Sequence, residues 1–133
     1  MDSRDLVLAG LNILIIDDEP KGRELTKRLL ILYHANVIVA STAIEGLELL
    51  RTLRPDVVVS DIDMPQMDGY QFIRAVRNLP AHRGGQTPAV AFTAFTRRED
   101  RKNALTAGFQ KYLSKPVDFE ELIDTIAAAA LSD

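Results

Sequence analysis

The sequence predicts a doubly wound α/β fold, in which helices cover both faces of a parallel β-sheet. Five short apolar runs alternate with five longer segments of helical period. The runs are almost continuously apolar, which is typical of parallel strands buried on both faces. The 133 residues, 47% of them hydrophobic, suit one domain with its own core. We therefore expect five strands and five helices in a single domain over residues 1–133, with the core at about residues 11–130.

The five predicted strands have largely apolar interiors. The strands are Asn12–Ile16, Asn36–Ser41, Asp56–Asp61, Ala89–Thr93 and Lys111–Ser114. The segment Leu79–Pro88, before the fourth strand, contains a Gly-Gly pair and is expected to be a mobile surface loop. Asp68-Gly69 is expected to form a turn after the third strand.

The helical segments follow the strands in order and carry recognisable start signals. Pro20 falls in the first turn of the first helix, where proline is tolerated. Capping residues are predicted at Thr42 with Glu45, at Thr96 with Glu99, and at Asp118. The fourth helix is polar, so its buried face is expected to be thin. The apolar positions expected to share a helix face are Leu25, Leu29, Leu32 and Tyr33; Ala43, Leu47 and Leu50; Phe72, Ile73 and Val76; and Phe119, Leu122, Ile123, Ile126 and Ala127.

Composition excludes several classes of function. The net charge of −3 lacks the positive balance of a nucleic-acid binder, so we expect no direct nucleic-acid partner. The absence of cysteine excludes disulfides and thiolate sites, and His34 and His82 are too few for a zinc centre. The apolar runs are of strand length, so we expect no membrane span. Residues 1–8 lack a signal-peptide core, which favours a cytoplasmic protein.

Polar side chains gather at one predicted edge of the sheet, beyond the carboxyl ends of the strands, where open parallel sheets bind ligands. They are Asp17, Asp18, Glu19, Asp61, Asp63, Thr93 and Lys115. Carboxylates about 4 Å apart repel by on the order of 4 kcal/mol per pair at an effective dielectric constant near 20. A hard cation such as Mg²⁺ would relieve that repulsion. A lysine and a hydroxyl nearby suit an arriving phosphoryl group, which a carboxylate can accept as an aspartyl phosphate.

The ordered set IIDDEP, VVVSDIDMPQMDGY, AFTA and YLSKP resembles the receiver domain of the response-regulator family in two-component signalling, over about residues 11–130. The resemblance implies the strand order 2-1-3-4-5. It also implies Mg²⁺-dependent phosphorylation by a histidine kinase or a histidine phosphotransfer domain. Such a domain is not an enzyme for a separate substrate, although it catalyses its own phosphorylation and dephosphorylation. A phosphorylation-dependent homodimer stays open.

The resemblance also implies roles for the acidic residues. Asp61 matches the phosphate-accepting aspartate and also binds the metal. Asp17 and Asp18 match the acidic pair that holds Mg²⁺, with Asp18 as a direct ligand and Asp17 acting through water. Asp63 occupies the position whose backbone carbonyl binds the metal, and its extra carboxylate is expected to disfavour anionic phosphodonors or to tune hydrolysis.

Further positions follow from the same resemblance. Thr93 and Lys115 match the hydroxyl and the ammonium that contact the phosphoryl group. Tyr112 matches the aromatic switch that turns inward and changes the surface of the fourth helix, fifth strand and fifth helix. Pro116 matches a proline preceded by a cis peptide bond. Phe95 is expected to shield the phosphoryl group from water.

Plainer interpretations stand beside these roles. Asp17-Asp18 alone would be a helix cap, and Tyr112 alone would be a packing residue of a short strand. Two other functions also stay open. One is a receiver-like docking module that never turns over phosphate. The other is a haloacid-dehalogenase-like phosphatase, because SDIDM resembles the DxD pattern of that family. Here Met64-Pro65 follows the second aspartate, where that family has a Thr or Val pattern. The acidic pair Asp17-Asp18 would also have no explanation in such an enzyme.

Overall fold

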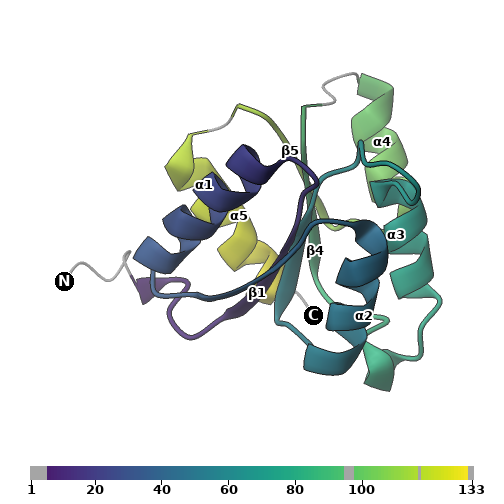
Figure 1. Cartoon of the computed structure of the whole chain (residues 1–133), viewed down its shortest axis with the longest axis horizontal. Coiled ribbons are helices and arrows are strands. Elements are labelled where there is room, and N and C mark those ends of the chain that lie inside the picture. The colour runs from purple at the N-terminus through teal and green to yellow at the C-terminus, as the bar shows by residue number, and fades with distance from the viewer. Residues whose placement is uncertain (1–5, 95–97, 117, 132–133) are drawn as a thin grey trace.

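A computed structural model of the chain describes residues 6–94, 98–116 and 118–131. Five parallel strands form one sheet in the order β2-β1-β3-β4-β5. Helices α1 and α5 cover one face, and α2, α3 and α4 cover the other (Figure 1). The predicted doubly wound fold and its strand order are confirmed. The elements are β1 Asn12–Ile16, α1 Pro20–Leu32, β2 Asn36–Ala40, α2 Ala43–Leu53, β3 Val57–Ser60, α3 Gly69–Arg77, β4 Ala89–Thr93, α4 Arg98–Ala107, β5 Lys111–Ser114 and α5 Phe119–Leu131.

The core consists of two clusters, one on each face of the sheet. Strand alternation divides β1 between them: Ile13 and Ile15 belong to the cluster under α1 and α5, whereas Leu14 and Ile16 belong to the other. All four side chains are almost fully buried. A buried isoleucine or leucine contributes about 1.5–3 kcal/mol, so a strand buried on both faces strongly favours the central position.

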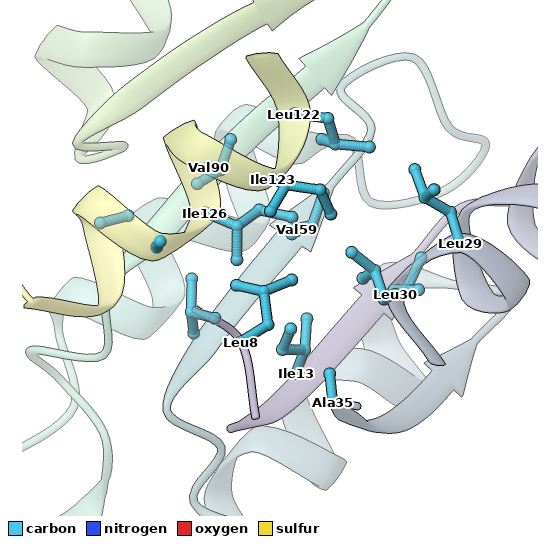
Figure 2. Packing of buried hydrophobic residues seen from close by; sticks show 14 of the residues in the cluster. Leu8, Ile13, Leu29, Leu30, Ala35, Val59, Val90, Leu122, Ile123 and Ile126 are labelled. Carbon is cyan, nitrogen blue, oxygen red and sulfur yellow. The ribbon is translucent and has the colours of Figure 1, made fainter. Parts of the chain in front are cut away.

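The core begins before the residue expected from the sequence. Leu8 is 0% exposed and packs in the cluster under α5, where Figure 2 shows it beside Ile13 and Ile126. The Gly10 N–H donates to the carbonyl of His34 at 3.1 Å, which ties this segment to the end of α1. A single apolar residue outside any periodic pattern carries no sequence signal of burial.

Two predicted helix faces need correction. Helix α1 buries Thr26, Leu29 and Leu30, while Leu25 and Leu32 are 59% and 73% exposed. The spacing i, i+3 and i+4 forms one stripe, and a polar threonine occupies its first position. Helix α5 buries its expected residues except Phe119 at its first position, which is 53% exposed.

The predicted helix starts are confirmed in part. The Thr42 hydroxyl accepts the Glu45 N–H at 3.1 Å, but the Glu45 carboxylate accepts from Ser41 instead of completing the box at Thr42. Asp118 accepts the Glu121 N–H at 2.8 Å, as expected for an N-cap. The predicted cap at Thr96 lies outside the described residues.

The predicted turn at Asp68-Gly69 is instead the start of α3. Asp68 is the N-cap, and its carboxylate accepts the Gln71 N–H at 2.9 Å. The Gln71 side chain accepts the Asp68 N–H at 2.9 Å, which completes a capping box. Turn and N-cap share the same residue preferences, so the sequence alone did not separate them.

The segment before β4, expected to be a surface loop, has local structure and packs against the rest of the domain. It contains a 3-10 helix, Ala81–Arg83, and Gly84 and Gly85 are buried. Arg54 donates to the carbonyls of Ala81 and His82. A Cβ at Gly85 would lie 2.0 Å from the Leu79 carbonyl oxygen, so the glycine is required by close packing. Across the described ranges, no helix is long and apolar enough to span a membrane.

Candidate functional site

Strand register brings the acidic residues together. Strands β1 and β3 are neighbours, and Ile16 pairs with Ser60, so the residues that follow them emerge side by side. Carboxylate oxygens of Asp17, Asp18 and Asp61 all lie within 4.8 Å of one another. Asp17 is buried, Asp61 is half-buried and Asp18 is exposed. The site is therefore anchored in the protein on one side and open to solvent on the other.

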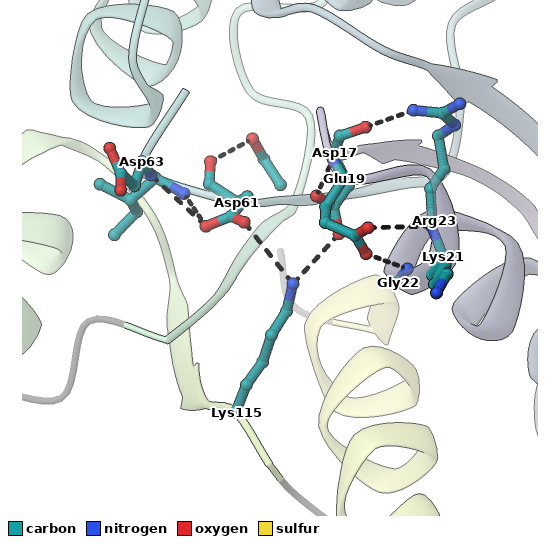
Figure 3. A network of polar contacts seen from close by, with 10 residues as sticks. Asp17, Glu19, Lys21, Gly22, Arg23, Asp61, Asp63 and Lys115 are labelled. Atoms are coloured by element: carbon teal, nitrogen blue, oxygen red, sulfur yellow. Dashed lines mark hydrogen bonds and ion pairs between the residues drawn. The ribbon is translucent and has the colours of Figure 1, made fainter. Parts of the chain in front are cut away.

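Lys115 reaches this cluster from the far end of the sheet. Its backbone N–H donates to the Thr93 carbonyl at 2.8 Å, which fixes the residue beyond β5. Its Nζ lies 3.1 Å from Asp17 Oδ2 and 3.5 Å from Asp61 Oδ2 (Figure 3). The same Nζ lies 5.1 Å from the centre of the Phe92 ring, within cation–π range. One ammonium thus contacts two of the three clustered carboxylates, and the cluster keeps an excess of negative charge.

Backbone amides fix the two carboxylates that Lys115 contacts. Asp17 Oδ1 accepts the Glu19 N–H at 3.0 Å, so its other oxygen is turned toward the lysine. Asp61 Oδ1 accepts the Ile62 N–H at 2.7 Å and the Asp63 N–H at 3.4 Å. Each carboxylate therefore has one oxygen held by the main chain and one directed into the site. Such fixed orientation lowers the reorganisation needed for chemistry.

The first turn of α1 forms one wall of the site. Glu19 caps this helix, and its carboxylate accepts the Gly22 N–H at 2.6 Å, a bond that lowers the pKa of Glu19. A Cβ at Gly22 would lie 3.2 Å from Asp17 Oδ2, so a larger residue would crowd that carboxylate. Arg23 donates to the Asp17 carbonyl at 2.8 Å. The helix and the acidic pair are therefore positioned together.

The pKa of Asp18 is shifted by its surroundings, which include several other carboxylates. Desolvation raises the pKa of Asp18 above its ordinary value, and the neighbouring carboxylates of Asp17, Asp61 and Asp63 raise it further. A backbone hydrogen bond partly opposes these effects. A cation placed among the three clustered carboxylates would reverse the repulsion. Oxygen donors of this kind are the ligands that Mg²⁺ prefers.

The remaining predicted residues occupy different surroundings. Thr93 is 0% exposed at the carboxyl end of β4. The Asp63 side chain is exposed and does not join the carboxylate cluster, although its backbone N–H reaches Asp61. Tyr112 is half-buried against the cluster under α2, α3 and α4, and desolvation raises its pKa. The Lys115-Pro116 peptide bond is cis, as expected. Phe95 lies outside the described residues.

Sequence reasoning missed two residues at this site, Arg23 and Phe92, whereas Glu19 was among the polar residues expected at this edge of the sheet. Phe92 could have been found, because it precedes Thr93 in a strand and must face the opposite side of the sheet. Its ring is packed against the cluster under α1 and α5, directly below the lysine stem. Arg23 carries no such signal, since a charged residue at a helix start is usually solvated.

The comparisons with known proteins agree with this geometry. The family model of the response regulator receiver domain matches residues 13–127. A 14.6 kDa protein from the sodA1 3' region of Leptolyngbya boryana is 46% identical over 125 residues, covering 94% of each chain. Response regulator MprA of Mycobacterium sp. (strain KMS) is 35% identical over 118 residues, which are 89% of this chain and 50% of MprA. This chain thus spans about half of that relative.

Two solved structures share the fold. The receiver domain of sensor histidine kinase PA1611 from Pseudomonas aeruginosa PAO1 has a TM-score of 0.84 and 29% identity, and the match covers 93% of this chain and 100% of that domain. That structure contains a magnesium ion coordinated in its active site cleft. Chemotaxis protein CheY4 of Vibrio cholerae has a TM-score of 0.83 and 29% identity, with 91% and 99% of the two chains covered.

Proposed function

The chain belongs to the response regulator receiver domain family of two-component signalling, and on that premise we propose that Asp61 is its phosphate acceptor. In this proposal a histidine kinase or histidine phosphotransfer domain donates the phosphoryl group, and Mg²⁺ is required. Receiver domains are signalling modules and not enzymes that act on a separate substrate. The chemistry assigned to this chain is accordingly its own phosphorylation and dephosphorylation.

One observation carries the proposal. Oxygens of Asp17, Asp18 and Asp61 converge within 4.8 Å, and the Lys115 ammonium lies 3.5 Å from Asp61. Positive groups aimed at a carboxylate are what transfer of an anionic phosphoryl group needs, because negative charge spreads over its oxygens in the transition state. A helix cap alone does not require a lysine from the other end of the sheet.

The donor set fits Mg²⁺, which takes hard oxygen ligands. Asp18 and Asp61 would hold the ion directly, Asp17 would act through water, and Asp63 would add its backbone carbonyl. When bound, the ion supplies positive charge to the carboxylates and to the phosphoryl oxygens. Lys115 supplies further charge from the opposite side.

The transfer forms one bond and breaks one. An oxygen of the Asp61 carboxylate attacks the phosphorus of a phosphohistidine, and an O–P bond forms as the N–P bond breaks. The electron pair of the broken bond stays on the departing imidazole nitrogen, and the ring leaves neutral with a proton on its other nitrogen. Lys115 stays protonated and pairs with the transferred group.

The response extends from the site to the surface. The Thr93 hydroxyl moves toward the phosphoryl oxygens, and Tyr112 then turns inward between α4 and β5. The surface formed by α4, β5 and α5 changes, and this surface is where an output partner or a second copy would bind. With a net charge of −3, we expect that partner to be a protein and not nucleic acid. We place this signalling in the cytoplasm.

The test is the intact mass of the chain after incubation with acetyl phosphate, with and without Mg²⁺. We expect one phosphoryl adduct that depends on Mg²⁺ and is lost on alkaline treatment. Asp61→Asn should abolish the adduct while the fold persists, because side-chain volume is kept and one repelling carboxylate is removed. Asp63→Asn is the matched control, and it should retain the adduct because the backbone carbonyl of Asp63 stays in place and the carboxylate that it loses is expected only to disfavour anionic donors or to tune hydrolysis.

Two outcomes would contradict the assignment. An adduct that persists in Asp61→Asn would place the acceptor elsewhere. No adduct from acetyl phosphate or from a phosphorylated histidine phosphotransfer domain would favour a docking module that never turns over phosphate. Light scattering of the phosphorylated chain would show a homodimer as a doubled mass.

A further inference from the structure

Arg77, the last residue of α3, joins three separate segments on the side of the sheet that carries α4. Its Nη1 donates to the carbonyls of Gly85 and Thr87 at 3.1 and 2.7 Å, which fixes the segment before β4. Its Nε donates to the carbonyl of Gly108 at 2.9 Å, just after α4. A single half-buried guanidinium therefore ties the carboxyl end of α4 to α3 and to the start of β4.

Gln110 extends this connection to the sheet. Its side-chain oxygen lies 3.4 Å from Arg77 Nη2 and also accepts the Ala89 N–H at 2.5 Å. The Gln110 N–H donates to the Ala89 carbonyl at 3.0 Å. Arg77 and Gln110 thus bind the chain that leaves α4 to the first residue of β4. We call Arg77, Gly108 and Gln110 the α4 clamp.

Packing reinforces the clamp at the carboxyl end of α4. Gly108 has a φ of +134°, and a Cβ there would lie 2.8 Å from Arg77 Cγ, so only glycine allows this close approach. Ala104 and Phe109 are buried at 0% and 3% exposure. Hydrogen bonds, backbone conformation and apolar burial all hold this end of the helix.

The amino end of α4 has far weaker attachments among the described residues. Glu99, Arg101 and Lys102 are exposed, and Asp100 is half-buried. From α3, the Tyr70 hydroxyl donates to the Asp100 carbonyl at this end at 3.4 Å, a long hydrogen bond. Among the residues that the structure describes, the carboxyl end of α4 thus has more attachments than the amino end.

From this asymmetry we propose that α4 moves as a lever about the α4 clamp. The proposal rests on the phosphorylation switch above and adds where the motion pivots. Phosphorylation would displace the amino end of α4, next to Tyr112 and the site, while the carboxyl end stays attached to Arg77. The clamp makes α4 rotate as a body instead of detaching, because its last turn cannot follow.

The expected displacement follows from helix geometry. Lys102 and Thr106 stand six and two residues before Gly108. At about 1.5 Å of rise per residue they lie about 9 and about 3 Å from the pivot, so a rigid rotation moves Lys102 about three times as far as Thr106. A helix that shifts as a whole would move both positions equally.

The test uses pairs of spin labels on the full chain, which has no native cysteine. Exposed Glu48 on α2 is the reference, so Glu48→Cys is combined either with Lys102→Cys or with Thr106→Cys. Distances are measured by pulsed electron paramagnetic resonance before and after phosphorylation with acetyl phosphate and Mg²⁺, with the adduct confirmed by mass on the same samples. We expect the change at position 102 to be about three times that at position 106.

Removing the clamp should abolish this difference. In Arg77→Met the change at position 106 should rise to equal that at position 102. Arg77→Lys, which keeps a charge and a donor, serves if Arg77→Met does not fold, and it should give an intermediate ratio. The matched control is Arg74→Met, one turn earlier on α3 and exposed, which should keep the threefold ratio.

The possible results distinguish the rotation of α4 about the α4 clamp from the phosphorylation on which it rests. Equal changes at both positions in the wild-type chain, or an unchanged ratio in Arg77→Met, would overturn the lever and leave phosphorylation intact. An adduct without any change at position 102 would also overturn the lever. No adduct would remove the proposed function, and the lever with it.

Discussion

Helices α4 and α5 both pack beside β5, yet they are attached to the sheet in different ways. The side chains that helix α5 buries are those of Leu122, Ile123, Ile126, Ala127 and Ala129. Figure 2 labels Leu122, Ile123 and Ile126 in the cluster on that face of the sheet. In the described part of α4, by contrast, the buried side chain is that of Ala104.

The difference teaches which element can change position at low cost. Each large apolar side chain buried by α5 contributes about 1.5–3 kcal/mol, so moving this helix would expose several such groups. In the described part of helix α4, the buried side chain is one alanine, and most of the hydrogen bonds to other segments lie at its carboxyl end. An element that buries little apolar surface has low local stability, and conformational switches use elements of this kind. Lys115 lies between β5 and α5, so the site connects the rigid helix with the movable one.

Truncating one apolar side chain in each helix should give the largest difference in stability between α5 and α4. Ile126→Ala removes a side chain that is 0% exposed and should lower the free energy of unfolding by about 3 kcal/mol. Leu105→Ala on α4 removes a side chain that is 42% exposed and should cost less than about 1 kcal/mol. Urea unfolding of both variants gives these values. Equal losses would mean that α4 is packed as firmly as α5.

Lys115→Ala should separate the helix response from phosphorylation. The variant leaves the buried Asp17 carboxylate without its ammonium partner at 3.1 Å and should cost about 2 kcal/mol without Mg²⁺. It should still bind Mg²⁺, because the three carboxylates remain. Amide exchange in α4 should then be the same with and without the phosphoryl group. A normal exchange response in this variant would contradict the coupling role of Lys115.

Loss of the cap of α5 should have a smaller effect. Asp118 accepts the Glu121 N–H at 2.8 Å, and Asp118→Ala should lower the free energy of unfolding by about 1 kcal/mol. Asp118→Asn is the matched control, because asparagine caps helices about as well as aspartate. Thermal or urea unfolding distinguishes the two variants. Equal stability of both would show that packing alone holds the start of α5.

The sequence predicted the rigid half of this comparison well. Buried parallel strands are visible in a sequence as apolar runs. The polar residues that follow them lie at the same edge of the sheet, beyond the carboxyl ends of the strands. Asp17, Asp61 and Lys115 were placed correctly for that reason. The face of α5 was predicted because Leu122, Ile123 and Ile126 repeat at helical spacing.

Other features depend on contacts that have no local pattern. Thr26 of α1 is buried while the neighbouring Leu25 is exposed. The way the helix is oriented on the sheet decides which of its residues face the core, and the hydrophobicity of a single residue does not. The sequence of the segment before β4 predicts a loop, but Arg54 donates to one of its carbonyls from 27 residues away and Arg77 to another from 10 residues away. Arginines that bind carbonyls in this way look like ordinary surface charges in a sequence.

The smallest expected effect concerns the loose end of α4. The Tyr70 hydroxyl donates to the Asp100 carbonyl at 3.4 Å, a long bond, so Tyr70→Phe should cost less than about 0.5 kcal/mol at neutral pH. Desolvation, followed by the nearby negative charge of Asp100, raises the pKa of Tyr70 above its ordinary 10.0. The folded state therefore favours the neutral phenol, and the stability this contributes is present below pH 10 and lost as pH rises through the raised pKa.

Stability measured between about pH 9 and pH 11 should consequently fall less in Tyr70→Phe than in the wild-type chain. Tyr33→Phe, on the opposite face beside α1, is the matched control for removing a phenol far from α4. Urea unfolding at each pH gives the slopes, and amide exchange at Arg101 and Lys102 reports the local attachment. If Tyr70→Phe and wild type lose stability in parallel while exchange at these amides is unchanged, the Tyr70 bond does not hold α4. The attachment of α4 to α3 would then come from the α4 clamp at its carboxyl end and not from Tyr70.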